Sequence, residues 1–245
     1  MIVSIINLTR GKLADEEIQR AIRAINRQIA QDFEPYWSFG ATLRLEGNTS
    51  NKPKKQRLPD LRGDAVLYLW DKIDSADADG YHDTNNRGIP YGFVLTDLAV
   101  DPAWTVTLSH EALELMADPQ GNLLVKGPHP KDHRHKVYHW FEMCDAVQDE
   151  SYEIDKVLVA NFVLPHYFTE RDELGTRNDF LGRKHDGQTL RSFGVNPGGY
   201  IGFFDPRTRR TSQSSFAREG DERAAARRAL KRKYGLSRSL LRGRS

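Results

Sequence analysis

The chain has 245 residues, of which 38% are hydrophobic and 29% are charged, which is typical of a soluble globular protein. The apolar segments Ala65–Trp70 and Val157–Pro165 are too short to cross a bilayer. Met1–Leu8 lacks the basic residues that begin a signal peptide, and the single cysteine, Cys144, excludes an intrachain disulfide. We therefore expect a cytoplasmic or virion-associated protein without membrane contact.

The net charge of +2 conceals an uneven distribution. Asp221–Ser245 contains nine Lys/Arg and two acidic residues, so the body that precedes it is acidic. Such a tail can contact nucleic acid or an acidic surface of a partner, and a solvated tail is an equal alternative. Only Tyr234 supplies a ring there, so the tail lacks the interleaved aromatic residues on which bases stack.

The first part of the chain predicts alternating strands and helices. Ile2–Leu8 is rich in β-branched residues and predicts a buried strand. Apolar residues at helical spacing from Ile18 predict a helix with an N-cap at Asp15 that continues to about Phe33, where Pro35 ends it. Further strands are predicted at Ala41–Leu45, Ala65–Trp70 and Tyr91–Leu98.

Residues 74–90 are rich in Asp, Asn and Gly and predict a long loop. Thr105–Pro119 predicts a helix that Pro119 and Gly121 end. The order strand, helix, strand, strand, strand, helix is that of the upper half of a zincin metallopeptidase, whose fourth strand lies at the sheet edge and binds an extended substrate. Here we expect that edge strand at Tyr91–Leu98, so Tyr91 and Phe93 are candidate substrate-binding residues.

Beyond residue 120 the sequence predicts less regular structure. We expect a histidine-rich loop at His129–His139, a short helix at Trp140–Val147, a strand or helix at Val157–Leu164, a strand at Tyr200–Phe204 and a helix at Asp221–Tyr234. The predicted fold class is α+β, a zincin-like mixed sheet with an active-site helix. Its domains are 1–205, divided into 1–119 with the sheet and helix and 120–205 as a C-terminal subdomain, and a basic tail at 206–245 that is partly disordered or helical.

The predicted helix at 105–119 carries residue types that bind metal ions. His110 and Glu114 project from one face because they are four residues apart, and Asp118 continues that face one turn further. Glu111 lies about 100° around the helix, where the HExxH arrangement places the general base. The sequence here is HExxE, so a carboxylate replaces the second histidine.

A bare HExxE is commonly a solvated helix face, but the other positions of this helix are apolar and indicate burial. Buried charge requires a cation or other partners. We expect a divalent metal, zinc first, with manganese, iron or calcium as alternatives because the ligand set contains more carboxylates than histidines. Glu142 and Asp145 are the candidates for a third ligand and for a group that orients His110.

Other candidate residues have simpler alternatives. Tyr81 and His82 are candidates for substrate contact, Tyr81 as a hydrogen-bond donor and His82 near the metal or substrate. Cys144 is favoured as a small core residue over a nucleophile. Four histidines are weighed as a second metal site, but a solvated loop is favoured because no cysteine or HxxxH helix accompanies them: His129, His133, His135 and His139.

Four segments in order resemble an uncharacterised family of phage, prophage and bacterial proteins: SHEALELMADP at 109–119, FEMCDAVQ at 141–148, NFVLPHYF at 161–168 and PGGY at 197–200. DGYHD at 79–83 and PYGFVLTD at 90–97 also fit that pattern, and the resemblance covers about residues 1–205. The first segment is more loosely similar to secreted proteins of the Exordium type. The resemblance implies a zincin-like fold with a metal site and no established substrate.

These features predict a metal-dependent hydrolase, a zincin-like peptidase that acts on a protein or peptide with Glu111 as the base. The alternative is a catalytically inactive metalloprotease-like fold that serves as a structural or interaction protein, for instance a phage particle component assembled with protein partners. A carboxylate ligand favours this alternative because it makes the metal a weaker Lewis acid. Nucleic-acid binding through the tail is a third prediction. The expected metal residues are His110, Glu114, Glu142, Asp118 and Asp145.

Overall fold

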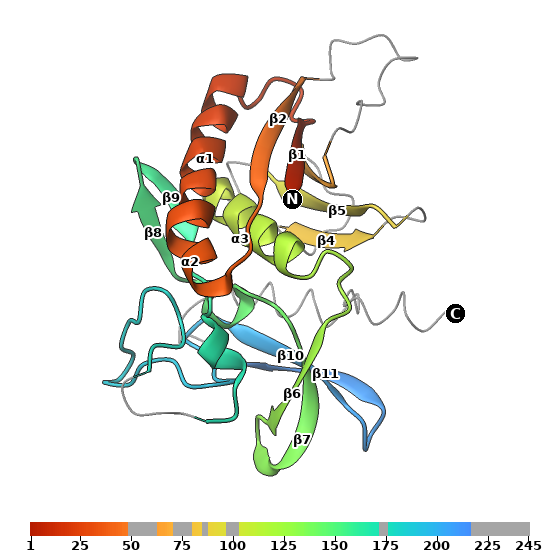
Figure 1. Ribbon diagram of the computed structural model, residues 1–245, viewed down its shortest axis with the longest axis vertical. Coiled ribbons are helices and arrows are strands. Elements are labelled where there is room, and N and C mark those ends of the chain that lie inside the picture. Colours follow the sequence, from red (N-terminus) through yellow and green to blue (C-terminus); the bar gives the residue numbers. More distant parts are fainter. Residues whose placement is uncertain (49–62, 71–79, 85–87, 97–102, 172–175, 217–245) are drawn as a thin grey trace. The chain divides into compact units, whose positions relative to one another are not determined.

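The computed structural model describes residues 1–48, 63–70, 80–84, 88–96, 103–171 and 176–216 (Figure 1). The chain forms two compact units of mixed α+β structure. Unit 1 comprises Met1–Gly121 and Tyr152–Ala160, and unit 2 comprises Asn122–Ser151 and Asn161–Ser245. Within the described ranges, no helix has the length and apolar character that a bilayer span requires.

Unit 1 contains a five-stranded mixed sheet with the order β2-β1-β3-β5-β4. Four strands run parallel, and β4 pairs antiparallel with β5 at one edge. The strands are β1 (Ile2–Asn7), β2 (Thr42–Asn48), β3 (Ala65–Trp70), β4 (Gly80–Thr84) and β5 (Pro90–Leu95). The apolar strands are confirmed close to their predicted bounds. The long loop predicted at 74–90 is wrong in part because it contains β4.

The edge position predicted for Tyr91–Leu98 is also wrong. The corresponding strand, β5, lies between β3 and β4, so both of its backbone edges are paired. Phe93 is instead part of an aromatic cluster, with its ring centroid 5.1 Å from that of Tyr68 and 5.8 Å from that of Tyr91. The edge strand next to it is β4, the fourth strand along the chain.

The parallel connection from β1 to β2 contains α1 (Asp15–Gln28), whose buried residues include Ile18 and Ile25. Ala14 is its N-cap, so the prediction of Asp15 at that position is one residue off. The helical path continues through the π-helix η1 (Ile29–Phe33) and α2 (Glu34–Trp37). Pro35 does not end it, because a proline in the first turn removes an N–H that needs no helical partner. The chain leaves the helix at Ser38, where φ is 60°.

The helix predicted at 105–119 is confirmed as α3 (Trp104–Ala117), with most of its side chains buried. A hairpin of β8 (Ser151–Ile154) and β9 (Val157–Ala160) returns to unit 1 from much later in the chain. Figure 1 shows this hairpin, in green, beside α1 and α3. The helix is therefore enclosed by elements from two distant parts of the sequence.

Unit 2 contains a four-stranded antiparallel sheet with the order β11-β10-β7-β6. Its strands are β6 (Leu124–His129), β7 (Asp132–Trp140), β10 (Tyr200–Asp205) and β11 (Arg210–Ser215). The predicted histidine-rich loop is thus wrong, since β6 and β7 form a hairpin. The predicted short helix is reduced to the 3-10 turn η4 (Asp145–Val147). The predicted tail begins with β11, and the helix expected at 221–234 lies outside the described residues.

Three of the sequence segments quoted above meet in unit 2. Val163 N donates to Met143 O at 2.7 Å, which joins NFVLPHYF to FEMCDAVQ. Gly199 of PGGY packs so closely against the same region that a Cβ atom would lie 2.3 Å from Ala146 O. Gln148 Nε2 also donates to Gly198 O at 2.6 Å. The turn at 197–199 therefore positions the chain that carries Glu142 and Asp145, and glycine is required there for close approach.

Candidate functional site

The core of the candidate site is a histidine–carboxylate pair on α3. His110 Nε2 lies 3.2 Å from Glu114 Oε2, and the two side chains are 15% and 5% exposed. Two ligands about 2.1 Å from a tetrahedral ion lie about 3.4 Å apart, so this separation fits a shared metal ion. It also fits a direct histidine–carboxylate contact. The helical spacing that predicted this pair is confirmed.

Two further acids on this helix are buried. Glu111 is 6% exposed and Asp118 is 1% exposed. Asp118 follows the last turn of α3, where its N–H donates to Glu114 O at 2.8 Å and its carbonyl accepts from Gly121 N at 2.9 Å. Carboxylates are rarely buried to this extent without partners. The interpretation of this helix face as solvated is therefore wrong.

A polar network next to His110 was not predicted. The Ser109 hydroxyl donates to Gln28 Oε1 at 2.6 Å and accepts from Ala160 N at 3.1 Å, and both polar side chains are 0% exposed. Gln28 Nε2 donates to Ala160 O at 2.7 Å. The one sequence feature that pointed to this network was Gln28, a polar residue at the end of the apolar face of α1. Its partners are distant in sequence, so the spacing within either helix did not reveal the network.

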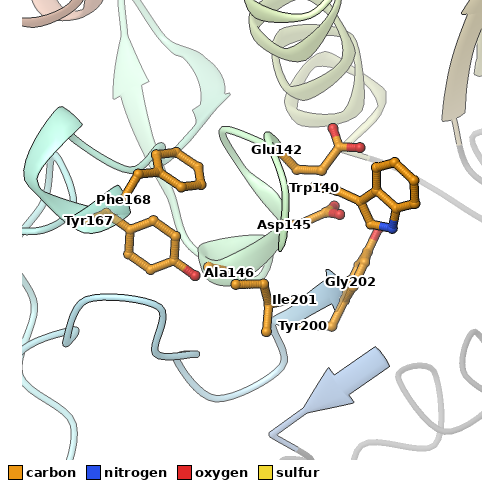
Figure 2. A pocket seen from close by; sticks show the side chains of 9 residues that line it. All are labelled: Trp140, Glu142, Asp145, Ala146, Tyr167, Phe168, Tyr200, Ile201 and Gly202. Atoms are coloured by element: carbon orange, nitrogen blue, oxygen red, sulfur yellow. The ribbon is translucent and has the colours of Figure 1, made fainter. Parts of the chain in front are cut away.

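Glu142 and Asp145 belong to unit 2 and line one small pocket, shown in Figure 2. The pocket has a volume of about 200 Å³ including the space at its open mouth. The two carboxylates lie beside Trp140, with Tyr167 and Phe168 opposite them (Figure 2). Asp145 is 6% exposed. Both acids thus line the same pocket, although the irregular chain after β7 and the turn η4 carry them instead of the predicted short helix.

Cys144, between these acids, is 0% exposed and has no disulfide partner. This burial agrees with the favoured prediction of a small buried residue. Tyr81 and His82 lie on β4, where their backbones pair with Phe93 and Gly92. Their side chains lie outside the described part of the structure.

A buried network of carboxylates and amides in unit 2 was also missed. Asn161 Nδ2 donates to Glu150 Oε2 at 2.9 Å and to Asp179 Oδ2 at 2.8 Å. Asn196 Nδ2 and His185 Nε2 both contact Glu150 Oε1, at 2.6 and 2.8 Å. Glu150 and Asn161 flank the β8–β9 hairpin, whereas the other three residues lie in the irregular chain between the 3-10 turn η5 (Pro165–Phe168) and β10, so the network connects these two parts of the chain.

The electrostatics of this network are set by burial. Asp179 is 0% exposed, and desolvation raises the pKa of its carboxyl above the ordinary value, although hydrogen bonds from Asn161 and Gly182 oppose the shift. Glu150 adds a further upward contribution to that pKa through its charge. The Asn161 amide orientation is fixed because its Oδ1 accepts from the backbone N–H groups of Phe162 and Leu181. The amide group therefore separates two acids that would otherwise repel each other.

The four histidines at 129–139 are distributed over the β6–β7 hairpin. His135 Nε2 lies 2.9 Å from Asp205 Oδ1, and His129 Nδ1 accepts from the backbone at Lys131 and Asp132. His133 is exposed, whereas His139 is buried. Among the described residues, none of the four belongs to a group of three ligand side chains close enough to share an ion. The favoured prediction of a solvated loop is nevertheless wrong for His139.

His139 should make unit 2 sensitive to acid. Burial lowers the pKa of His139 from 6.5 to about 4; its hydrogen bond to Pro128 O opposes this shift, and the charge of His129 adds to it. Because the folded-state pKa is depressed, neutral His139 stabilises the unit fully above pH 6.5, and this stabilisation is lost as the pH falls toward 4. The loss should be about 3 kcal/mol.

Urea unfolding of wild type and His139→Gln at pH 7, 5.5 and 4.5 measures this contribution, because glutamine does not titrate and can still donate to Pro128 O. We expect the free energy of unfolding to fall more steeply with acid in wild type than in the variant. Since Asp179 titrates with the opposite sign, only the difference between the two proteins is informative. Parallel pH profiles would rule out this role for His139.

Comparison of the chain with protein-family models and with curated proteins gives no match.

Proposed function

We propose that the protein is a metal-dependent hydrolase, a zincin-like peptidase whose divalent metal, zinc first among the candidates, is held in part by His110 and Glu114. The observation that carries the proposal is the 3.2 Å separation of His110 Nε2 and Glu114 Oε2 on a buried helix. Glu111 on α3 and Asp118 directly after its last turn, both buried, supply the additional carboxylates.

The strand arrangement supports the same proposal. The zincin order expected from the sequence has its fourth strand at the edge of the sheet. Here β4 is that strand and pairs antiparallel with β5, although β5 makes a fifth strand before the helix α3. An edge strand has free backbone groups that can hold an extended peptide. We therefore propose β4, which carries Tyr81 and His82, as the substrate-binding strand in place of β5.

When bound, a divalent cation supplies Lewis acidity toward a carbonyl group and toward water. Glu111 accepts a proton from the attacking water and donates it to the leaving amine. His110 and Glu114 orient their ligand atoms through the one-turn spacing of the helix, and Glu114 adds negative charge where a second histidine would add none. Glu142 as a third ligand and Asp145 as an orienting group stay predictions from the sequence.

Metal analysis tests the proposal directly. Full-length protein dialysed against Zn²⁺ and then against metal-free buffer should retain about one equivalent by mass spectrometry, and His110→Ala should lose it. His133→Ala is the matched control because His133 is exposed on β7, in the other unit. Glu142→Gln in the same assay tests the third ligand. Equal metal content in His110→Ala and wild type would contradict the proposal.

A second candidate function is favoured by Glu114 itself. A carboxylate donates more charge to a metal than an imidazole does and weakens the metal's Lewis acidity. In this second candidate the metal is only a structural clamp in an interaction protein. Retention of one metal equivalent without hydrolysis of any peptide in a mixed library would support this candidate over the peptidase.

A further inference from the structure

The outer edge of β9 is bonded by side chains of two helices. Among the residues that the structure describes, the β8–β9 sheet has two strands, so no described strand pairs with the other edge of β9. Thr105 Oγ1 of α3 donates to Leu158 O at 2.8 Å. Ser109 of α3 accepts from Ala160 N, and Gln28 of α1 donates to Ala160 O. These side chains replace a strand partner for the backbone groups at this edge.

The bonds at Ala160 close into a ring. Gln28 Nε2 donates to Ala160 O at 2.7 Å, Ala160 N donates to Ser109 Oγ at 3.1 Å, and Ser109 Oγ donates to Gln28 Oε1 at 2.6 Å. The serine hydroxyl is both donor and acceptor, and its bond to Oε1 fixes which end of the glutamine amide faces Ala160. Both side chains are 0% exposed, so water does not compete for these bonds.

We propose that Ser109 is a positioning residue for the candidate metal centre, which makes this inference dependent on the proposed function. Thr105 and Ser109 are four residues apart, so both anchors lie on one face of α3. His110 is the next residue after Ser109, and Glu114 follows one turn later. Anchoring this face against β9 fixes the rotation of α3 about its axis and thereby the directions of both ligand side chains.

A metal site requires accurately placed ligand atoms, so an anchor that prevents rotation of α3 should affect metal affinity strongly. Side-chain tips lie about 5–6 Å from a helix axis, so a rotation of about 10° moves them by about 1 Å. Metal ligation tolerates distance errors of only about 0.2 Å. A small rotation is therefore costly for a metal site, whereas apolar packing around the helix can accommodate it. Loss of the anchor should reduce metal affinity more than a general loss of stability predicts.

The test measures the Zn²⁺ dissociation constant of full-length Ser109→Ala by competition with a chromophoric chelator, beside urea unfolding of the same protein. We expect affinity to fall by about 10- to 100-fold, the usual effect of removing a group that orients a ligand. Thr9→Val is the matched control, because Thr9 is also 0% exposed in unit 1 and its hydroxyl bonds to Asn7 Oδ1 and Leu13 N. The control should lose stability but retain wild-type affinity.

Two further variants keep the test decisive. Thr105→Val removes the less buried anchor and should give a smaller loss of affinity if Ser109→Ala does not fold. Gln28→Met removes the other side chain of the ring, and the double variant with Ser109→Ala should lose less affinity than the sum of the single losses. Wild-type affinity in Ser109→Ala, or an equal loss in Thr9→Val, would overturn this inference alone. A wild-type chain that binds no metal would overturn the proposed function as well.

Discussion

Replacement of Glu111 by glutamine should abolish peptide hydrolysis and leave the bound metal in place. Glutamine has nearly the shape of glutamate and can occupy a site that is 6% exposed, but its amide cannot accept the proton of the attacking water. Turnover should fall by about 10²- to 10⁴-fold, the usual contribution of a general base. The measurement combines initial rates on a peptide library with metal analysis of the same preparation.

Glu153→Gln is the control for this substitution, since Glu153 is exposed on β8 and the same change of charge there should not alter the rate. Hydrolysis by Glu111→Gln at the wild-type rate would exclude Glu111 as the base. Loss of both metal and activity would instead give Glu111 a role in holding the site together.

Replacement of Asn161 by alanine should cause the largest loss of stability in unit 2, about 3–5 kcal/mol. The change removes the donor shared by Glu150 and Asp179 and the acceptor of two backbone N–H groups, and these three side chains are at most 4% exposed. Two buried carboxyls would then face each other without the intervening amide. Urea unfolding at pH 7 measures the free energy, and Gln213→Ala on exposed β11 is the control.

Asn161→Asp separates charge repulsion from lost packing. It places a third carboxyl between Glu150 and Asp179, so its destabilisation should be greater at pH 7 than in acid, because burial already raises the pKa of Asp179 and protonation there reduces the repulsion. A loss below about 1 kcal/mol for Asn161→Ala would contradict the importance of this network, because that is the effect of an ordinary hydrogen bond.

The elements that the sequence predicted well are those whose signal is local. The apolar run of β3 and the helical spacing in α1 and α3 do not depend on distant residues. By contrast, β4 has the sequence GYHDT, which contains no apolar run. In β7 the more buried positions alternate as His135, Val137 and His139. Because two of these three are histidines, the sequence lacks the alternation of apolar and polar residues that predicts a strand.

In the candidate site, too, the features set by local sequence were predictable and those set by distant contacts were not. The His110–Glu114 pair was predictable because a helix brings residues i and i+4 together whatever surrounds it. The polar networks were not predictable, since Ser109 meets a glutamine 81 residues away and Asn161 meets acids in two separate irregular segments. Such contacts depend on the folding of the whole unit, and no spacing within one element encodes them.

The return of residues 152–160 to unit 1 has a consequence for biosynthesis. As the chain leaves the ribosome, α3 emerges before β9, the segment that Thr105 and Ser109 bond in the folded protein. Until about residue 160 has emerged, the hydroxyls of α3 and the Gln28 amide lack those bonds to β9. The first unit therefore completes its fold only after part of the second has been synthesised, and a chain that stops at Gly121 would lack this strand.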